Sequence, residues 1–139
     1  IVDDALLNRK VLCTFLEKTG IKMDEAASGE EAIEKYIYSP VGYYNIIFMD
    51  IHMPNMNGYE ATEKIRRSDK MDALTVPIIA VTADAFKETE ERVLVSGMNG
   101  FISKPINFAK LSEIVKKALS SQLNTNERIM VWTKINNLD

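Results

Sequence analysis

The stretch that decides the fold is residues 45–50 (NIIFMD), an uninterrupted apolar run that ends in the acid Asp50. A second run of the same kind, residues 77–82 (PIIAVT), ends in the hydroxyl of Thr82. Apolar runs without polar alternation are typical of strands that are buried on both faces, as in a parallel sheet. The two runs therefore predict interior strands of a sheet that is covered on both sides.

Segments with helical spacing alternate with these two strands and with three shorter ones. The shorter strands are expected at residues 1–2, 21–26 and 100–103. Helices are expected to begin near Leu7, at the capping box of Ser28, at Gly58, after Thr82 and at Asn107. Strand and helix thus alternate five times, which predicts an α/β fold, a doubly wound three-layer sandwich around a five-stranded parallel sheet.

Apolar positions indicate which helix faces should pack on the sheet. The first helix, expected to end at Gly20, carries the stripe Leu7, Val11, Leu12, Phe15 and Leu16. The helix between Ser28 and Pro40 carries Ala32, Ile33, Tyr36 and Ile37. The last helix, expected to run from Asn107 to about Ser121, carries Leu111, Ile114, Val115, Ala118 and Leu119.

The composition excludes several classes of protein. The 139 residues suit one domain, and 46% hydrophobic with 27% charged residues is ordinary for a globular chain. A net charge of −3 lacks the basic footprint of a nucleic-acid binder, so no direct nucleic-acid partner is expected. One cysteine (Cys13) and one histidine (His52) exclude an internal disulfide and a typical zinc site. With no apolar run of membrane-spanning length and no signal peptide, no membrane partner and a cytoplasmic location are expected.

The ends of the chain suggest a piece of a longer protein. Only Ile1 and Val2 precede the acids Asp3 and Asp4, so the first predicted strand is truncated. We expect a domain over residues 1–121, followed at 122–139 by an extension or linker whose pattern predicts no definite structure.

Polar side chains follow the strands at one predicted edge of the sheet, where ligands bind in open α/β folds. The first strand ends in Asp3 and Asp4, and the others end in Asp50, Thr82 and Lys104. Three carboxylates at close quarters repel, by about 4 kcal/mol per pair 4 Å apart at an effective dielectric of 20. Oxygen ligands of this kind favour a hard cation, so we expect Mg²⁺, with Mn²⁺ as a substitute.

Such a site suits phosphoryl transfer to an aspartate. A carboxylate attacks phosphorus as a nucleophile, and the transferring group spreads negative charge over its equatorial oxygens. Mg²⁺ and Lys104 would neutralise this charge, and Thr82 would donate a hydrogen bond only once the phosphoryl group is present. The last contact predicts a switch.

Four motifs together resemble the receiver domain of two-component signalling proteins. They are Val2-Asp3-Asp4, Met49-Asp50-x-x-Met53-Pro54-x-Met56-x-Gly58, Pro77-Ile78-Ile79-Ala80-x-Thr82-Ala83 and Phe101-x-x-Lys104-Pro105. The similarity covers residues 1–121 in the family's order and spacing, and four motifs in register are highly specific. It implies a flavodoxin-like sheet with strand order 2-1-3-4-5.

The resemblance also implies a role for each site residue. Asp50 would be the phosphorylated residue, and Mg²⁺ would be held by Asp3, Asp4, Asp50 and the main-chain carbonyl of His52. Lys104 would clamp the phosphoryl group, ahead of a cis peptide bond at Pro105. Thr82 and Phe101 would form the switch, and Gly58 would have a structural role.

The partners implied are those of a phosphorelay. The donor would be a phosphohistidine, on a kinase dimerisation domain or on a histidine phosphotransfer domain. The fourth helix, fifth strand and fifth helix would form the output face and the surface of a homodimer. Residues 97–100 (GMNG) and the pair Asn8-Arg9 resemble receivers of hybrid sensor histidine kinases, although the receiver of a response regulator remains an alternative. The chain itself would be a signalling switch that catalyses its own phosphorylation and dephosphorylation, rather than an enzyme.

Other interpretations stay open on the sequence alone. An aspartate-nucleophile phosphohydrolase needs a second acid two residues after the nucleophile, where this chain has His52. A flavin-binding module would want a phosphate-binding loop where Asp3 and Asp4 stand, and a receiver that only docks would lack one of the site residues. His52 is more simply a pocket-edge residue than a phosphohistidine, Cys13 a helix residue of the core, and Phe101 a core aromatic as readily as a switch.

Overall fold

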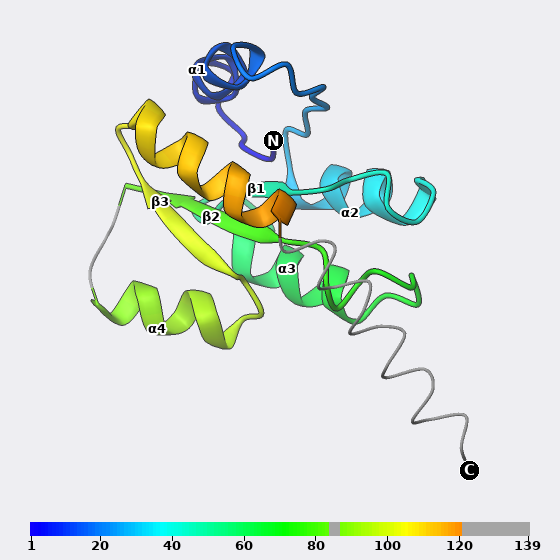
Figure 1. Ribbon diagram of the computed structural model, residues 1–139. Coiled ribbons are helices and arrows are strands. Elements are labelled where there is room, and N and C mark those ends of the chain that lie inside the picture. The colour runs from blue at the N-terminus through cyan, green and yellow to red at the C-terminus, as the bar shows by residue number, and fades with distance from the viewer. Residues whose placement is uncertain (84–86, 121–139) are drawn as a thin grey trace.

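A computed structural model describes residues 1–83 and 87–120 of the chain (Figure 1). Four labelled helices and three labelled strands follow one another: α1 (Leu6–Glu17), α2 (Gly29–Tyr38), β1 (Ile47–Asp50), α3 (Gly58–Arg66), β2 (Ile78–Thr82), α4 (Lys87–Val95) and β3 (Gly100–Ser103). Residues 108–120 form a further helix, here called the 108–120 helix. The predicted extension at 122–139 lies outside the described residues, so its boundary near residue 121 stays a prediction.

The three labelled strands are parallel, and β2 lies between β1 and β3. β1 pairs with β2 from Ile47 opposite Ile78, and β2 pairs with β3 from Ile79 opposite Gly100. Beyond β1, Val2 makes parallel bridges to Met49 on one side and to Ala26 on the other. The spatial order is therefore residue 26, residue 2, β1, β2, β3, which is the predicted order 2-1-3-4-5 of a flavodoxin-like fold.

The edge of the sheet beyond Val2 is shorter than predicted. We expected a strand over residues 21–26, but in the described chain only Ala26 forms a bridge there. Residues 21–24 and residues 43–46 both line a groove, together with Ile1 and Phe48. In the described part of the chain, residues 21–24 form no strand, and the ladder begins where Val2 stands between Ala26 and Met49.

Alternation along the strands assigns the helices to two layers. Successive strand residues point to opposite faces, and the even and odd positions of β1 and β2 indeed join different clusters. Ile47, Met49, Ile78 and Ala80 pack with residues of α2, α3 and α4, whereas Phe48, Ile79 and Val81 pack with residues of α1 and the 108–120 helix. Figure 1 shows α1 and the 108–120 helix above the sheet and α3 and α4 below it. Both faces are covered, as the apolar runs predict.

Local signals in the sequence place the starts of two helices correctly. Ser28 caps α2 by accepting a hydrogen bond from the Glu31 N–H at 3.1 Å, and the Glu31 carboxylate accepts one from the Ala27 N–H at 2.9 Å. Asn107 accepts from the Lys110 N–H at 3.1 Å. After α1, Gly20 adopts a positive φ of 78°, which suits glycine. The predicted caps at Ser28 and Asn107 are confirmed, whereas α1 ends at Glu17 with Lys18 as its C-cap, before the predicted end at Gly20.

The predicted helix stripes are correct in the middle and wrong at their edges. In α1, Leu12 and Leu16 are buried, but Leu7 is 75% exposed and Val11 41% exposed. Ile37 and Leu119 are also exposed, at 44% and 42%. The physical reason is that the sheet covers only a narrow strip of each helix, so residues at the margin of an apolar stripe stay in contact with solvent.

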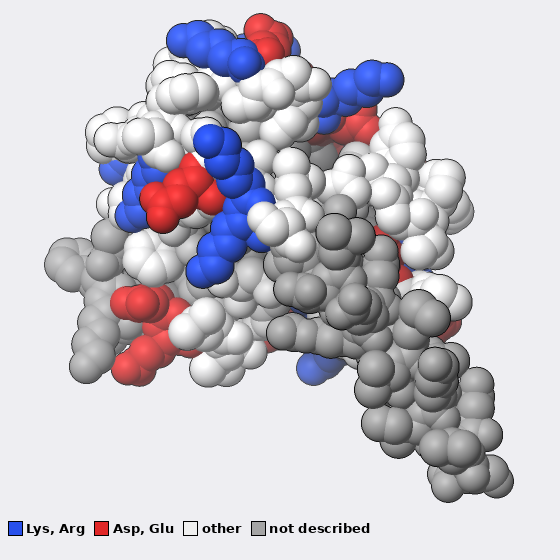
Figure 2. All heavy atoms as spheres, in the orientation of Figure 1, with Lys and Arg blue, Asp and Glu red and all other residues white. Residues whose placement is uncertain are grey.

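The surface carries charges of both signs. On the face that Figure 2 shows, lysine and arginine side chains are interspersed with aspartate and glutamate, so this face has no continuous basic patch. In residues 1–83 and 87–120, no helix combines the length and the apolar character that crossing a membrane requires.

Candidate functional site

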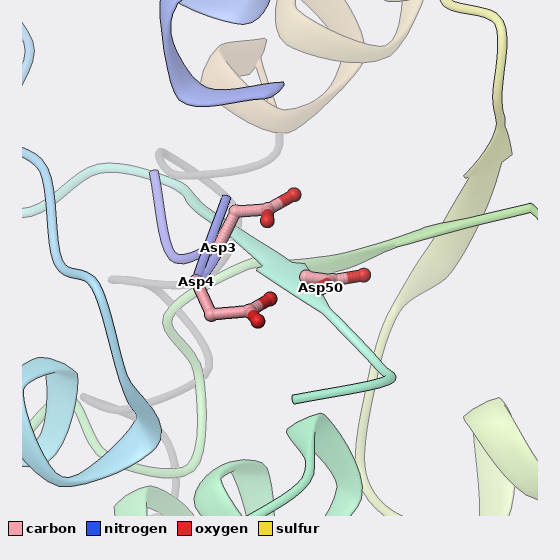
Figure 3. A group of neighbouring side chains, drawn as sticks. All are labelled: Asp3, Asp4 and Asp50. Atoms are coloured by element: carbon pink, nitrogen blue, oxygen red, sulfur yellow. The ribbon is translucent and has the colours of Figure 1, made fainter. Parts of the chain in front are cut away.

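Three carboxylates meet at the edge of the sheet where the strands end. Asp3 and Asp4 follow the bridging residue Val2, and Asp50 is the last residue of β1. One carboxylate oxygen from each of the three lies within 4.8 Å of the others. Figure 3 shows the three side chains extending to the same side of the sheet. Asp3 and Asp50 are buried, at 4% and 5% exposure, and Asp4 is open to solvent.

Lys104 brings a positive charge to this cluster from the end of β3. Its ammonium lies 3.3 Å from Asp3 Oδ2 and 3.5 Å from Asp50 Oδ1. Its main-chain N–H donates to the Thr82 carbonyl at 2.7 Å, which ties the turn after β3 to the end of β2. The Lys104–Pro105 peptide bond is cis. The lysine therefore lies between two acids that are distant from it in the sequence.

The electrostatics of the cluster raise the pKa of the Asp50 carboxyl above its ordinary value. Burial is the largest cause, the charge of Asp3 adds to it, and the ammonium of Lys104 opposes both. Desolvation and a neighbouring like charge both disfavour the ionised form. Without a cation, the ionised form of Asp50 is therefore held at a cost in free energy, and one lysine does not fully offset three acids.

Asp3 is held at all of its polar groups. Its N–H donates to the Ala26 carbonyl at 3.1 Å, and its carboxylate accepts from the Ala5 N–H at 2.9 Å. Its carbonyl accepts from Arg9 Nη1 at 2.8 Å, and Asn8 Nδ2 is 3.5 Å from its Oδ1. Neither Ala5 nor Arg9 was predicted to take part in the site. No signal identifies them, because these bonds depend on where the first turn of α1 lies.

The remaining predicted residues lie around the cluster at different depths. Thr82 ends β2, is fully buried and stands opposite Ser103 in the register. Phe101, in β3, is partly buried and packs against the core cluster on the α3 and α4 side of the sheet. The His52 side chain is exposed, two residues beyond Asp50. The structure thus brings together Asp3, Asp4, Asp50 and Lys104, with Thr82 at the next strand end.

The loop after Asp50 is held close to the strand by Gly58. The Gly58 N–H donates to the Ile51 carbonyl at 2.8 Å, and a Cβ added at Gly58 would lie 2.3 Å from the Asp50 carbonyl oxygen. Within the loop, Asn55 has a positive φ of 68°, a conformation that asparagine tolerates better than most residues. Met53 and Met56, which belong to this loop, are buried. The loop therefore passes the site in a fixed position.

The donor atoms in this cluster suit a hard divalent cation. They are carboxylate oxygens, two of the three acids are buried, and burial and the charge of Asp3 raise the pKa of Asp50 despite the neighbouring Lys104. Oxygen ligands with an open side facing solvent match the preference of Mg²⁺, which keeps several waters. The residues present therefore fit a magnesium ion.

Comparison with known proteins identifies the family. The response regulator receiver domain matches residues 1–116. The chain belongs to this family. The receiver domain is 42% identical over 118 residues to hybrid signal transduction histidine kinase L of Dictyostelium discoideum, covering 84% of this chain. The chain spans only 7% of the length of that relative. The family and fold expected from the four motifs are thus confirmed.

Solved structures agree with this assignment. The receiver domain of sensor histidine kinase PA1611 from Pseudomonas aeruginosa PAO1, with a magnesium ion coordinated in its active site cleft, has a TM-score of 0.77 and 32% identity, over 86% of this chain and 94% of that one. The co-crystal structure of the Saccharomyces cerevisiae phosphotransfer protein Ypd1 with the receiver domain of Ssk1 contains a chain with a TM-score of 0.77 and 30% identity, over 87% of each. The chain is therefore a receiver domain of two-component signalling.

Proposed function

We propose that this receiver domain accepts a phosphoryl group on Asp50 from a phosphohistidine and changes its output face in response. The observation that carries the proposal is the cluster of Asp3, Asp4 and Asp50 with Lys104 between two of them. A buried carboxylate whose ionised form is disfavoured by its neighbours needs a cation, and a cation there is what a phosphoryl group also needs. A cation bound at this cluster would therefore stabilise the ionised carboxylate and also neutralise the charge of the phosphoryl group.

In the transfer step, one oxygen of the Asp50 carboxylate attacks phosphorus. A P–O bond to Asp50 forms as the P–N bond to the donor imidazole breaks, and the imidazole nitrogen keeps the electron pair and takes up a proton. Lys104 is positioned to balance the charge of the phosphoryl oxygens from the side of β3. When bound by Asp3, Asp4, Asp50 and the His52 carbonyl, Mg²⁺ would supply the remaining charge neutralisation.

The phosphorylated state would differ from the free state at Thr82 and Phe101. A phosphoryl group on Asp50 offers new acceptor oxygens near the end of β2, and the Thr82 hydroxyl would turn to one of them. Phe101 is partly buried on the neighbouring strand, so a change at Thr82 reaches it through the β2–β3 pair. The output face would be formed by α4, β3 and the 108–120 helix, and this face would serve for a homodimer.

The wider setting of the domain is also part of the proposal. Its relatives include hybrid histidine kinases, and a similar fold occurs in a complex that contains a histidine phosphotransfer protein. We infer a place in a hybrid sensor histidine kinase, with a kinase dimerisation domain or a phosphotransfer domain as the donor. The domain itself would catalyse its own phosphorylation and slow hydrolysis, as a switch rather than an enzyme with a separate substrate. The cytoplasmic location stays a prediction.

Labelling with a small phosphodonor tests the assignment of Asp50. The protein is incubated with acetyl phosphate and Mg²⁺, and the phosphorylated residue is located by reductive trapping and mass spectrometry. Asp50→Asn should abolish labelling, because the amide is no nucleophile for phosphorus. The matched control is Asp69→Asn, at an exposed acid beyond the end of α3, which should label like the parent. If Asp50→Asn labels as well as the parent, the assignment is wrong.

A further inference from the structure

The first turn of α1 reaches the acidic cluster through Arg9. Its Nη1 donates to the Asp3 carbonyl at 2.8 Å, and its Nε lies 3.2 Å from Glu25 Oε1. The Arg9 side chain is 14% exposed, so both contacts are made by a largely buried group. Long charged side chains on a helix surface usually extend into solvent. This one instead spans from the helix to the residue that starts the site.

The contacts of Arg9 close a ring around the main chain of Asp3. Arg9 binds the Asp3 carbonyl, the Asp3 N–H binds the Ala26 carbonyl, and Ala26 follows Glu25, which binds Arg9 again. The main chain of Asp3 is thereby held from both sides, one side by α1 and the other by residues 25–26. Because Asp3 and Asp4 are consecutive, fixing the carbonyl of Asp3 also fixes the peptide plane that leads to Asp4.

A second cation on the same helix provides a natural comparison. Lys10 Nζ lies 3.0 Å from Glu25 Oε2, so Lys10 and Arg9 bind the same carboxylate. The Lys10 side chain is 59% exposed, and its ammonium donates a hydrogen bond to Glu25 Oε2. Both residues therefore hold α1 to residue 25, and Arg9 alone of the two also holds Asp3.

We propose that Arg9 is a positioning residue for the cation site, acting through the Asp3 carbonyl to fix the Asp3–Asp4 turn. The inference rests on the proposed function, since the geometry of this turn matters only if the acids bind a cation. Groups that orient metal ligands typically change metal affinity by about 10- to 100-fold when they are removed. Arg9 does not touch the phosphoryl group, so it acts on the affinity for Mg²⁺ and leaves the chemistry at Asp50 unchanged.

The test compares Arg9→Gln with Lys10→Gln. Binding of Mg²⁺ to each protein is measured by isothermal titration calorimetry, and the labelling rate with acetyl phosphate is measured across Mg²⁺ concentrations. We expect Arg9→Gln to weaken Mg²⁺ binding by about tenfold. The Mg²⁺ concentration at half-maximal labelling should rise by the same factor, with the maximal rate retained. Lys10→Gln should match the parent in both measurements.

The outcomes separate this inference from the proposed function. If the parent binds Mg²⁺ and Arg9→Gln binds it equally well, Arg9 only tethers α1 and the inference is overturned. An equal loss in Lys10→Gln overturns it too, because the effect then belongs to the contact with Glu25. If the parent binds no Mg²⁺, the proposed function itself fails.

A conservative variant covers the case in which Arg9→Gln does not fold. Arg9→Lys keeps the charge beside Glu25, but its single ammonium replaces two separate donor nitrogens that bind two acceptors. We expect a folded protein, by circular dichroism, with Mg²⁺ binding severalfold weaker than in the parent. Parent-like affinity in Arg9→Lys contradicts the inference.

Discussion

Asp50 is a nucleophile that the fold keeps buried beside another acid. Its raised pKa has burial as the first cause and the charge of Asp3 as the second. Ionising it therefore costs more free energy in the folded chain than in the unfolded chain, where an aspartate titrates near about 3.9. The cost is absent below that pH and complete above the raised pKa, so this residue lowers the stability of the metal-free protein as the pH rises.

Replacing Asp50 by asparagine should remove this cost. In EDTA, we expect Asp50→Asn to melt at a higher temperature than the parent at neutral pH. The difference should shrink as the pH falls towards the ordinary aspartate range, since the parent residue is then protonated as well. Melting temperatures of both proteins across acidic to neutral pH give the measurement. A difference that does not change with pH would show that Asp50 carries no electrostatic cost.

Lys104 offsets part of the same repulsion. Lys104→Met keeps most of the side-chain volume and removes the charge that lies between Asp3 and Asp50. The Lys104 side chain is 25% exposed, so we expect a loss of roughly 1–3 kcal/mol in the free energy of unfolding in EDTA, below the range for fully buried pairs. Urea denaturation measures it. Added Mg²⁺ should stabilise this variant more than the parent, because the cation then supplies the missing charge.

The control for this variant is Lys110→Met, at an exposed lysine on the 108–120 helix. It should change the free energy of unfolding by no more than about 0.5 kcal/mol, as is usual for surface positions. Equal effects of the two substitutions would show that the pairing of Lys104 with the acids contributes nothing.

At the scale of elements, the close approach of the start of α3 to the end of β1 depends on one glycine. A Cβ at Gly58 would overlap the main chain of Asp50 and Ile51, at 2.3 Å from a carbonyl oxygen and 2.9 Å from a Cα atom. Gly58→Ala should therefore push α3 away from the strand end and cost about 1–3 kcal/mol, as overpacked sites do. It should also slow labelling of Asp50, whose carbonyl is the atom displaced. Chemical denaturation and the labelling assay measure the two effects.

Gly100 in β3 provides the matched control. Among the described residues, a Cβ there meets only Ile79 Cδ1, at an ordinary contact distance of 3.8 Å. Gly100→Ala should leave labelling unchanged and should not lower the free energy of unfolding by more than about 0.5 kcal/mol. If both alanine variants behave alike, the close approach at Gly58 has no structural consequence.

The elements differ in how far sequence alone predicts them. β1 and β2 are predicted correctly because both faces are buried, so the apolar pattern is a property of the strand itself. The cap at Ser28 is equally local, since its partner Glu31 is three residues away. The exposed margin of α1 at Leu7 could not be predicted, because exposure depends on how much of the helix the sheet covers.

The contacts of the site also differ in how far the sequence alone predicts them. The strand-end positions of Asp50 and Thr82 follow from the strand pattern, and the position of Lys104 follows from the motif after β3. The hold of Arg9 on Asp3 does not, because it requires the first turn of α1 to lie against both Asp3 and Glu25. A contact that joins three segments of the chain leaves no periodic signal in any one of them.

At the scale of the whole molecule, the cation should stabilise the fold. A ligand that binds only the folded state adds free energy of about 2.7 kcal/mol at one hundred times its dissociation constant. Mg²⁺ should therefore raise the melting temperature, at constant ionic strength. Asp4→Ala should reduce that rise, and in EDTA the variant should melt no lower than the parent, because the substitution removes one of three acids that repel one another. No response of the parent to millimolar Mg²⁺ would count against the site.

Two buried acids, one exposed acid and a lysine meet at one place in the molecule, where the parallel strands end. The most direct test is a crystal structure of the protein with Mg²⁺ and beryllofluoride, an unreactive mimic of the phosphoryl group. We predict beryllofluoride on the Asp50 carboxylate, Mg²⁺ among the oxygens of Asp3, Asp4 and Asp50, and the Lys104 ammonium against a fluorine. A structure grown with both that shows neither of them at Asp50, under conditions where the protein is folded, would contradict the account.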